Sequence, residues 1–123
     1  MAVTYTTAVK NARLSAVVTQ IGAVGVLEIG TTGMGTILAT ISLGNPAGTA
    51  SGGVLTFSGF PRSDTSADNT GTAAVARIRT ASGGTDIVTG LTVGTSASDI
   101  NLDSVSITTG QTVTITSATI THA

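Results

Sequence analysis

The sequence is poor in the side chains on which most protein chemistry depends. Its 123 residues include no Cys, no Trp, one Tyr, two Phe and a single His, and charged residues make up only 9%. The absence of Cys excludes disulfides, thiolate nucleophiles and cysteine metal sites. A net charge of −1 argues against nucleic-acid and membrane partners, since both are recognised by basic patches. The scarcity of aromatic rings leaves no stacking platform for bases or sugars.

The few reactive groups do not form a catalytic set. His122 lies one residue from the end of the sequence, where chains fray, so it is a poor member of a Ser–His–acid triad. The Gly-rich segment "GTTGMG" (30–35) lacks the Lys-Ser/Thr that completes a phosphate-binding loop. We therefore predict no catalytic residues and no cofactor, and we expect that the protein is not an enzyme.

Two groups of acidic residues are the only candidates for a metal ion. Asp64 and Asp68 with Asn69, or Asp99 with Asp103, could supply oxygen ligands to Ca²⁺. Neither group has EF-hand spacing, and a hard cation needs six or more oxygens. The more common role of such side chains is to stabilise turns, so we predict no metal site.

What the sequence does contain favours β-structure. Thr, Ser, Ala, Val and Ile dominate, together with 16 Gly, and β-branched residues suit strands whereas Gly suits tight turns. Short runs of alternating apolar and polar residues are separated by turn signals about every 8–12 residues. No helical pattern lies between these runs, which excludes parallel βαβ units. We predict one all-β domain over residues 1–123, an antiparallel β-sandwich or jelly roll of about eight short strands within 23–123.

The alternation also predicts which side chains face the core. In "GTILATISLG" (35–44) the phase places Leu38 outward and its neighbours Ile37 and Ala39 inward. In the predicted hairpin over 71–94, three apolar residues share the inner face and two arginines the outer: Ala74, Ala76 and Ile78, against Arg77 and Arg79. Changes of phase predict bulges or bends near 103–104 and near Ser117.

One segment has helical rather than strand periodicity. In "TAVKNARLSAVVTQI" (7–21), Leu14, Val17, Val18 and Ile21 recur at helical spacing, and Gly22 stands where a C-cap is expected. We predict an amphipathic helix with a narrow apolar stripe, so that residues 1–22 form an N-terminal arm and helix. The preceding "MAVTYTT" either reaches a neighbouring subunit or frays. No segment has the pattern of a signal peptide or a membrane span, so we expect a soluble product of a cytoplasm.

The order of these segments resembles a known family. The C-terminal part, "TGTAAVARIRTASGGTDIVTGLTVGTSASDINLDSVSITTGQTVTITSATITHA", resembles small virion proteins of tailed bacteriophages. The upstream segments "AVKNARLSAVVTQI", "LEIGTTGM", "LATISLGNPAGTASGGVLTFSG" and "DTSADNTGTA" agree with it. The similarity spans nearly the whole length, although each motif is only a strand or a turn.

The resemblance implies a capsid decoration, or cement, protein. Such a protein binds the outside of the phage head and stabilises contacts between subunits of the major capsid protein. We would then expect it in the virion, on the head exterior, after assembly in the host cytoplasm, as a homo-oligomer that is a dimer or a trimer. The alternative is a tail or fibre β-domain that binds a host surface receptor. The family has no reactive signature, so no functional residues carry over.

Candidate interface residues come instead from the rarity of charged and aromatic groups. Arginine and aromatic residues are enriched in interface hot spots, although solvated arginines on a strand face are the more common case. Phe60 and Arg62 stand together at a strand end, where Phe60 is either a contact group or a core plug. The predicted interface residues are Tyr5, Lys10, Arg13, Phe60, Arg62, Arg77 and Arg79.

Overall fold

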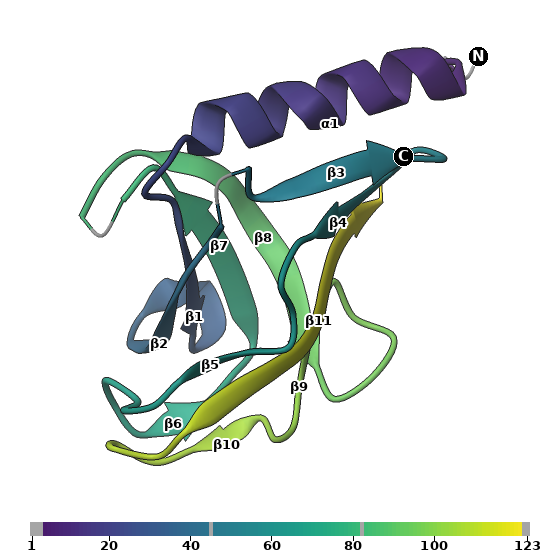
Figure 1. Cartoon of the computed structure of the whole chain (residues 1–123). Coiled ribbons are helices and arrows are strands. Elements are labelled where there is room, and N and C mark those ends of the chain that lie inside the picture. Colours follow the sequence, from purple (N-terminus) through teal and green to yellow (C-terminus); the bar gives the residue numbers. More distant parts are fainter. Residues whose placement is uncertain (1–3, 45, 82, 122–123) are drawn as a thin grey trace.

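The computed structural model describes residues 4–44, 46–81 and 83–121, which form one curled sheet with a single α-helix beside it (Figure 1). The expected N-terminal arm, in its residues 1–3, and His122 fall outside the described residues. Within them, the elements in chain order are α1 (Thr7–Ile21), β1 (Val26–Gly30), the 3₁₀ turn η1 (Thr32–Met34), β2 (Ile37–Ser42), β3 (Gly48–Ser51), β4 (Val54–Phe57), β5 (Arg62–Asp64), β6 (Gly71–Thr72), β7 (Val75–Arg79), β8 (Asp86–Gly94), β9 (Ile100–Leu102), β10 (Ser106–Ile107) and β11 (Val113–Thr121).

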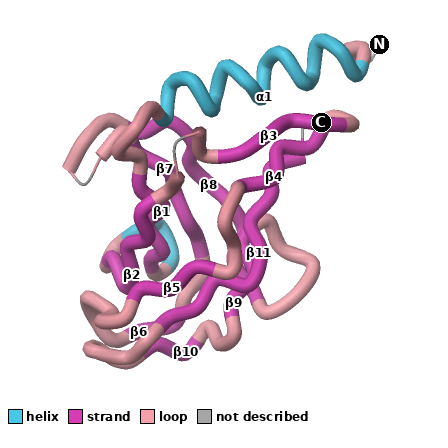
Figure 2. Tube along the Cα trace, in the orientation of Figure 1, coloured by secondary structure: helices cyan, strands magenta, loops and turns pink. Residues whose placement is uncertain are grey.

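The nine-stranded sheet has the order β2-β1-β7-β8-β9-β11-β4-β3, with β5 also paired to β11. β6 and β10 form a separate two-stranded ribbon. The main sheet curls until β5 lies beside β2, so that strands surround the interior (Figures 1 and 2). The prediction of a mostly β domain with one N-terminal helix is confirmed.

The expectation of a purely antiparallel sheet is wrong at one pair of strands. β8 and β9 are parallel, with Val93 opposite Ile100. The intervening loop is held back on β8 by two hydrogen bonds. The Thr92 N–H donates to Asp99 Oδ2 at 3.0 Å, and the Asp99 N–H donates to Thr92 Oγ1 at 2.9 Å. After this loop, β9 therefore runs in the same direction as β8.

The core is a single cluster inside the curl. Its largest completely buried side chains include Leu27 and Ile29 of β1, Leu55 of β4, Ile78 of β7 and Ile115 of β11. Each buried aliphatic side chain of this size contributes about 1.5–3 kcal/mol. Strands drawn from the whole length of the chain are thereby joined in one hydrophobic unit.

Two predicted side-chain orientations are wrong. Leu38 was expected to point outward but is completely buried, because Gly71 of β6 lies against its side chain, so closely that a Cβ at Gly71 would lie 3.1 Å from Leu38 Cδ2. Ala74 was expected inward but is exposed, because β7 begins only at Val75. Ala73 is buried in its place. The other alternating residues of the hairpin, Ala76 and Ile78, are buried as predicted.

The helix α1 has the predicted bounds. The Thr6 side chain caps its first turn by accepting the Val9 N–H, and Gly22, at φ +72°, ends it. Leu14 and Ile21 are buried, and the helix packs along β3 and β4 (Figure 1). The side chain of Asn11 accepts the Gly53 N–H of the β3–β4 turn at 2.9 Å. The helix is therefore fixed to the sheet by both apolar and polar contacts.

The predicted irregularities near the C-terminal end are confirmed. β9 ends at Leu102 and β10 begins at Ser106, so the chain leaves the sheet at residues 103–104. The register between β11 and β9 shifts between Ile115 and Ser117. This bulge lets one long strand serve two parts of the curled sheet.

Candidate interaction site

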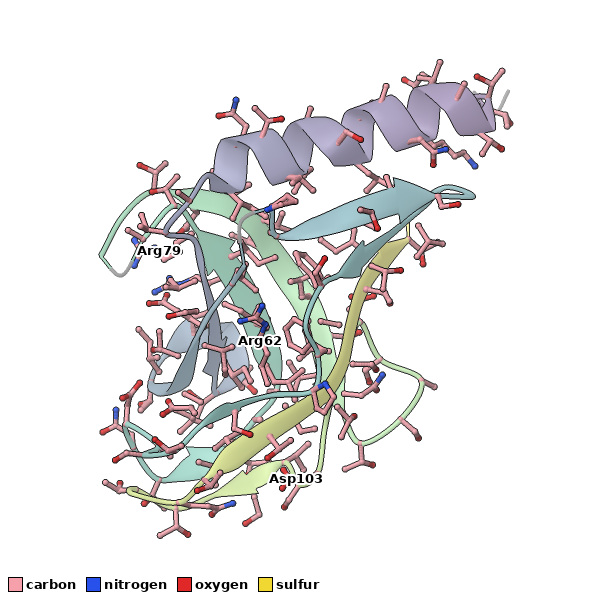
Figure 3. The ribbon with its side chains drawn as sticks, in the orientation of Figure 1. Arg62, Arg79 and Asp103 are labelled. Carbon is pink, nitrogen blue, oxygen red and sulfur yellow. The ribbon has the colours of Figure 1, made fainter. Side chains whose placement is uncertain are left out.

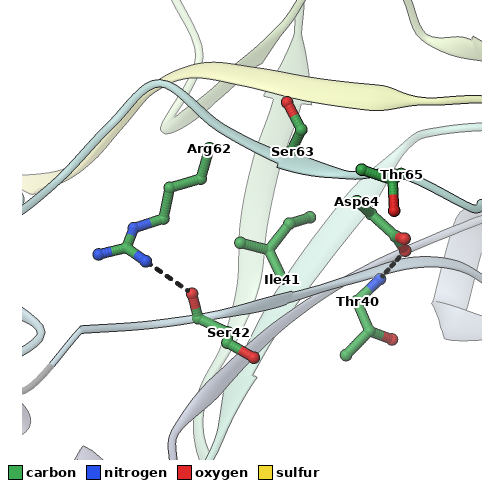
Figure 4. A pocket seen from close by; sticks show the side chains of 7 residues that line it. All are labelled: Thr40, Ile41, Ser42, Arg62, Ser63, Asp64 and Thr65. Carbon is green, nitrogen blue, oxygen red and sulfur yellow. Dashed lines mark hydrogen bonds between the residues drawn. The ribbon is translucent and has the colours of Figure 1, made fainter.

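A polar pocket opens where the curled sheet returns on itself, between β2 and β5 (Figure 4). Its volume is about 410 Å³. Ile41 lines it from the core side, and the other side chains around it carry hydroxyl, carboxylate or guanidinium groups. The lining residues are Thr40, Ile41, Ser42, Arg62, Ser63, Asp64 and Thr65.

Side chains rather than a backbone ladder bridge the two strands at this pocket. The Thr40 N–H donates to Asp64 Oδ2 at 3.0 Å, and Arg62 Nη1 donates to the Ser42 carbonyl at 3.3 Å (Figure 4). We call the contact between β2 and residues 62–69 the β2 seam. It occupies the edge of a strand that ends the sheet, and such an edge otherwise offers unpaired backbone groups to other chains.

The seam continues past the pocket along the same edge. The Asp68 N–H donates to the Leu38 carbonyl at 2.7 Å, and Asn69 Nδ2 donates to the Ile37 carbonyl at 2.8 Å. Asp68 Oδ2 also accepts the Thr40 hydroxyl at 3.1 Å. The polar segment 62–71 therefore serves as a cover for β2 in addition to forming a surface loop.

Contacts with nearby residues orient the two charged side chains of the pocket, Arg62 and Asp64. Arg62 Nε donates to the Ser58 carbonyl at 3.2 Å, and its guanidinium lies 5.7 Å from the centre of the Phe60 ring. Asp64 accepts the Ser66 N–H through its second oxygen at 3.0 Å. The Thr65 side chain lies beside Asp64, whereas the Ser63 hydroxyl points away from the pocket and pairs with Thr114 Oγ1 of β11 at 3.0 Å (Figure 4).

Phe60 itself packs partly against the core and makes an edge contact with Phe57, with ring centres 6.5 Å apart. The arrangement agrees with the interpretation of Phe60 as a core plug. Phe60 and Arg62 nevertheless contact each other, as their closeness in the sequence suggested.

Arg77 and Arg79 lie on the outer face of β7, but both contact a buried carboxylate. Glu28 of β1 is 3% exposed; its Oε1 accepts a hydrogen bond from Arg77 Nε at 2.7 Å and lies 3.7 Å from Arg79 Nη1. The two arginine side chains are themselves only about one-fifth exposed. Their charges are therefore neutralised inside the chain instead of being presented in full to a neighbour.

A second carboxylate completes this ion cluster. Asp86 Oδ1 lies 2.9 Å from Arg79 Nε, an ion-pair contact whose angle does not make it a hydrogen bond. Two guanidinium groups are thus balanced by two carboxylates. Sequence reasoning missed Glu28, although an isolated acid amid the apolar residues of "VLEIG" (26–30) was the available signal.

The remaining predicted interface residues lie at the N-terminal end of α1: Lys10 and Arg13 belong to the helix, and Tyr5 precedes its N-cap Thr6. The guanidinium of Arg13 lies 4.8 Å from the centre of the Tyr5 ring, and the stem of Lys10 packs near Gly53. The seven candidates therefore fall into three groups on different elements: α1, the β2 seam and the β1–β7 ion cluster. Figure 3 shows Arg62 and Arg79 well separated.

The acidic residues proposed as metal ligands take part in turns and strand edges. Asp64 and Asp68 bind Thr40, Asp99 binds Thr92, and Asp103 is exposed near β10 (Figure 3). Within residues 4–44, 46–81 and 83–121, no group of three or more His, Asp or Glu side chains is placed to hold a metal ion.

Comparisons with models of protein families, with curated proteins and with solved structures found no match to this chain. In the described part of the chain, no helix has the length and apolar character needed to cross a membrane.

Proposed function

We propose that this chain is a non-enzymatic structural protein of a tailed-bacteriophage virion, most specifically a decoration protein on the outside of the head. In this role it would bridge subunits of the major capsid protein, as a dimer or trimer. Its curled sheet would be a distorted form of the β-sandwich or jelly roll that the sequence predicts. The family resemblance supplies the virion context for this proposal.

The structural observation that most supports this proposal is that most charged side chains contact other groups within the chain. Glu28, Arg77, Arg79 and Asp86 neutralise one another, and Arg62 and Asp64 hold the β2 seam. These groups stabilise the fold, and the surface that remains is rich in Ser and Thr. Such a surface can lie against another protein without the cost of removing many ions from water. Weak contacts of this kind become strong when repeated around a shell.

The proposal predicts a loss of particle stability when the protein is absent. Phage particles assembled without this chain should release their DNA at a lower temperature than complete particles, and at low salt concentrations that complete particles withstand. Adding the purified chain should restore the stability of the complete particles. The measurement is DNA release followed with an intercalating dye during heating. Particles that are equally stable with and without the chain would contradict a cementing role.

A second candidate is a tail or fibre domain that binds a host receptor, and the open β2–β5 pocket favours it. Fixed Arg62 and Asp64 side chains among exposed hydroxyls would suit a polyhydroxylated ligand. The soluble chain should then block phage adsorption to host cells, and Thr65→Trp, which adds a large side chain at an exposed lining residue of the pocket, should abolish the block. A decoration protein would not affect adsorption.

A further inference from the structure

The helix α1 carries a second apolar stripe that does not face the sheet. Val9, Ala12 and Ala16 are separated by three and four positions, the spacing of one helical face, and Tyr5 stands beside them just before the N-cap Thr6, outside the helix itself. All four are exposed, and Tyr5 and Val9 remain 42% and 43% exposed. They are two of the three large hydrophobic side chains that are exposed in the described part of the chain.

This stripe is distinct from the one that packs on the protein's own sheet. The packed side of the helix contains Leu14, Val17, Val18 and Ile21, about half a turn away around the axis. Most helices of soluble proteins have one apolar face and one polar face. A helix with two apolar sides, one of them uncovered, is suited to lie between its own domain and a partner.

The charge of the helix indicates the chemistry of that partner. α1 carries Lys10 and Arg13 and no acidic residue. Arg13 lies over the Tyr5 ring beside the stripe, and the helix dipole adds partial positive charge at the same end. An apolar surface bordered by carboxylates complements this arrangement.

A second copy of the helix is a poorer occupant. It would bring Arg13 of one helix, which borders the stripe, toward Arg13 of the other. In addition, α1 is about 22 Å long, and two such helices alone bury less than the roughly 1,200 Å² of a stable interface.

We propose that the exposed stripe of α1 docks into an apolar groove bordered by Asp or Glu on a subunit of the virion shell. The inference rests on the proposed function and names the surface that would carry it out. Val9 is the anchor, the small Ala12 and Ala16 allow the helix to approach closely, and Arg13 pairs with carboxylates at the rim.

The test is co-sedimentation of the purified full-length chain with phage heads assembled without it. Val9→Glu adds a charge to the stripe, yet it creates a capping box with Thr6 and so should preserve the helix. Thr7→Glu is the matched control. It adds the same charge in the same helical turn, but about 200° around the axis from Val9.

We expect Val9→Glu to weaken binding about tenfold or more, as truncation of an interface anchor does, whereas Thr7→Glu should bind within about twofold of the wild type. Arg13→Gln should weaken binding and reduce its dependence on salt between about 50 and 300 mM. Circular dichroism checks the fold, and Ala16→Glu serves as a second stripe variant if Val9→Glu folds poorly.

The outcomes separate the two proposals. If the wild-type chain does not bind heads at all, the proposed function fails. If the wild-type chain binds heads but the stripe variants and Thr7→Glu bind equally well, the proposed docking surface is wrong, whereas the proposed function is retained. If the stripe variants instead abolish self-association of the free chain and leave binding to heads unchanged, the occupant is a second copy and the inference is overturned.

Discussion

At the scale of single residues, the main feature is a buried carboxylate on a strand of otherwise apolar residues. Glu28 is almost completely buried, and Arg77 and Arg79 cover it. A buried ion pair is not necessarily more stable than an apolar pair of the same size, but removal of one partner leaves an uncompensated charge. Glu28 therefore links β1 to β7, and the burial of Arg77 and Arg79 depends on its charge. A Leu at the same position would not create this dependence.

Glu28→Gln should destabilise the protein, because it leaves two partly buried arginines with a weaker acceptor. The arginines retain some contact with water, so we expect a loss of about 2 kcal/mol in the free energy of unfolding, below the loss for a completely buried pair. Urea denaturation measures it. Asp86→Asn removes the same charge beside Arg79, but from an exposed side chain, and should cost less than about 1 kcal/mol. Equal effects of the two substitutions would contradict this account of the cluster.

The local pattern predicts which side chains of β7 face the core, but it does not predict partners that lie far away in the sequence. The alternation in 71–79 correctly separated Ala76 and Ile78 from Arg77 and Arg79. Glu28, the partner of the two arginines, lies 49 residues upstream of Arg77. No local pattern indicates which strand β7 will pair with. The arginines were predicted as surface groups for a neighbour because the position of β1 beside β7 is a property of the whole sheet.

At the scale of elements, the β2 seam replaces a strand ladder. β2 ends the sheet, and its outward backbone groups are bound by side chains of Arg62, Asp64 and Asn69 and by the Asp68 backbone. A bare edge would invite pairing with other chains. The protein protects this edge within its own chain, so a need to cover β2 gives no argument for a partner.

Asp64→Ala should open the seam locally. It removes the acceptor of two backbone N–H groups, those of Thr40 and Ser66, and should cost about 1–2 kcal/mol. Amide exchange of Thr40 should accelerate more than that of core amides, which hydrogen exchange with NMR detection measures. Asp103→Ala, which truncates an exposed acid away from the seam, should change neither quantity. Unchanged Thr40 protection in Asp64→Ala would show that the edge is held by other contacts.

Elements with strong local signals were predictable, and those set by side-chain hydrogen bonds were not. The bounds of α1 follow from its helical periodicity and Gly22, and the bulge at Ser117 follows from a change of phase. The parallel pairing of β9 depends on the mutual hydrogen bonds of Thr92 and Asp99, which alternation does not encode. Similarly, the polar composition of 62–71 is typical of an exposed loop, but its role as a cover for β2 depends on where the sheet closes.

At the scale of the whole molecule, the curled sheet, its seam and the packed helix make a body in which most charged groups have partners within the chain. The exposed stripe of α1 differs from this pattern, since it presents apolar side chains beside Arg13, for which no ion pair is found within the described residues. Under the proposed function, the molecule would act by shape and repeated contact. This is the physical basis on which the proposed virion role and the α1 docking surface depend.

The most direct measurement is a cryo-electron-microscopy reconstruction of the mature phage head at a resolution that traces this chain. We predict that the chain is found on the outer surface of the head, in a regular array, with the Val9 side of α1 against the capsid subunits. Absence of the chain from the virion, or its location at the tail with α1 facing solvent, would contradict the account.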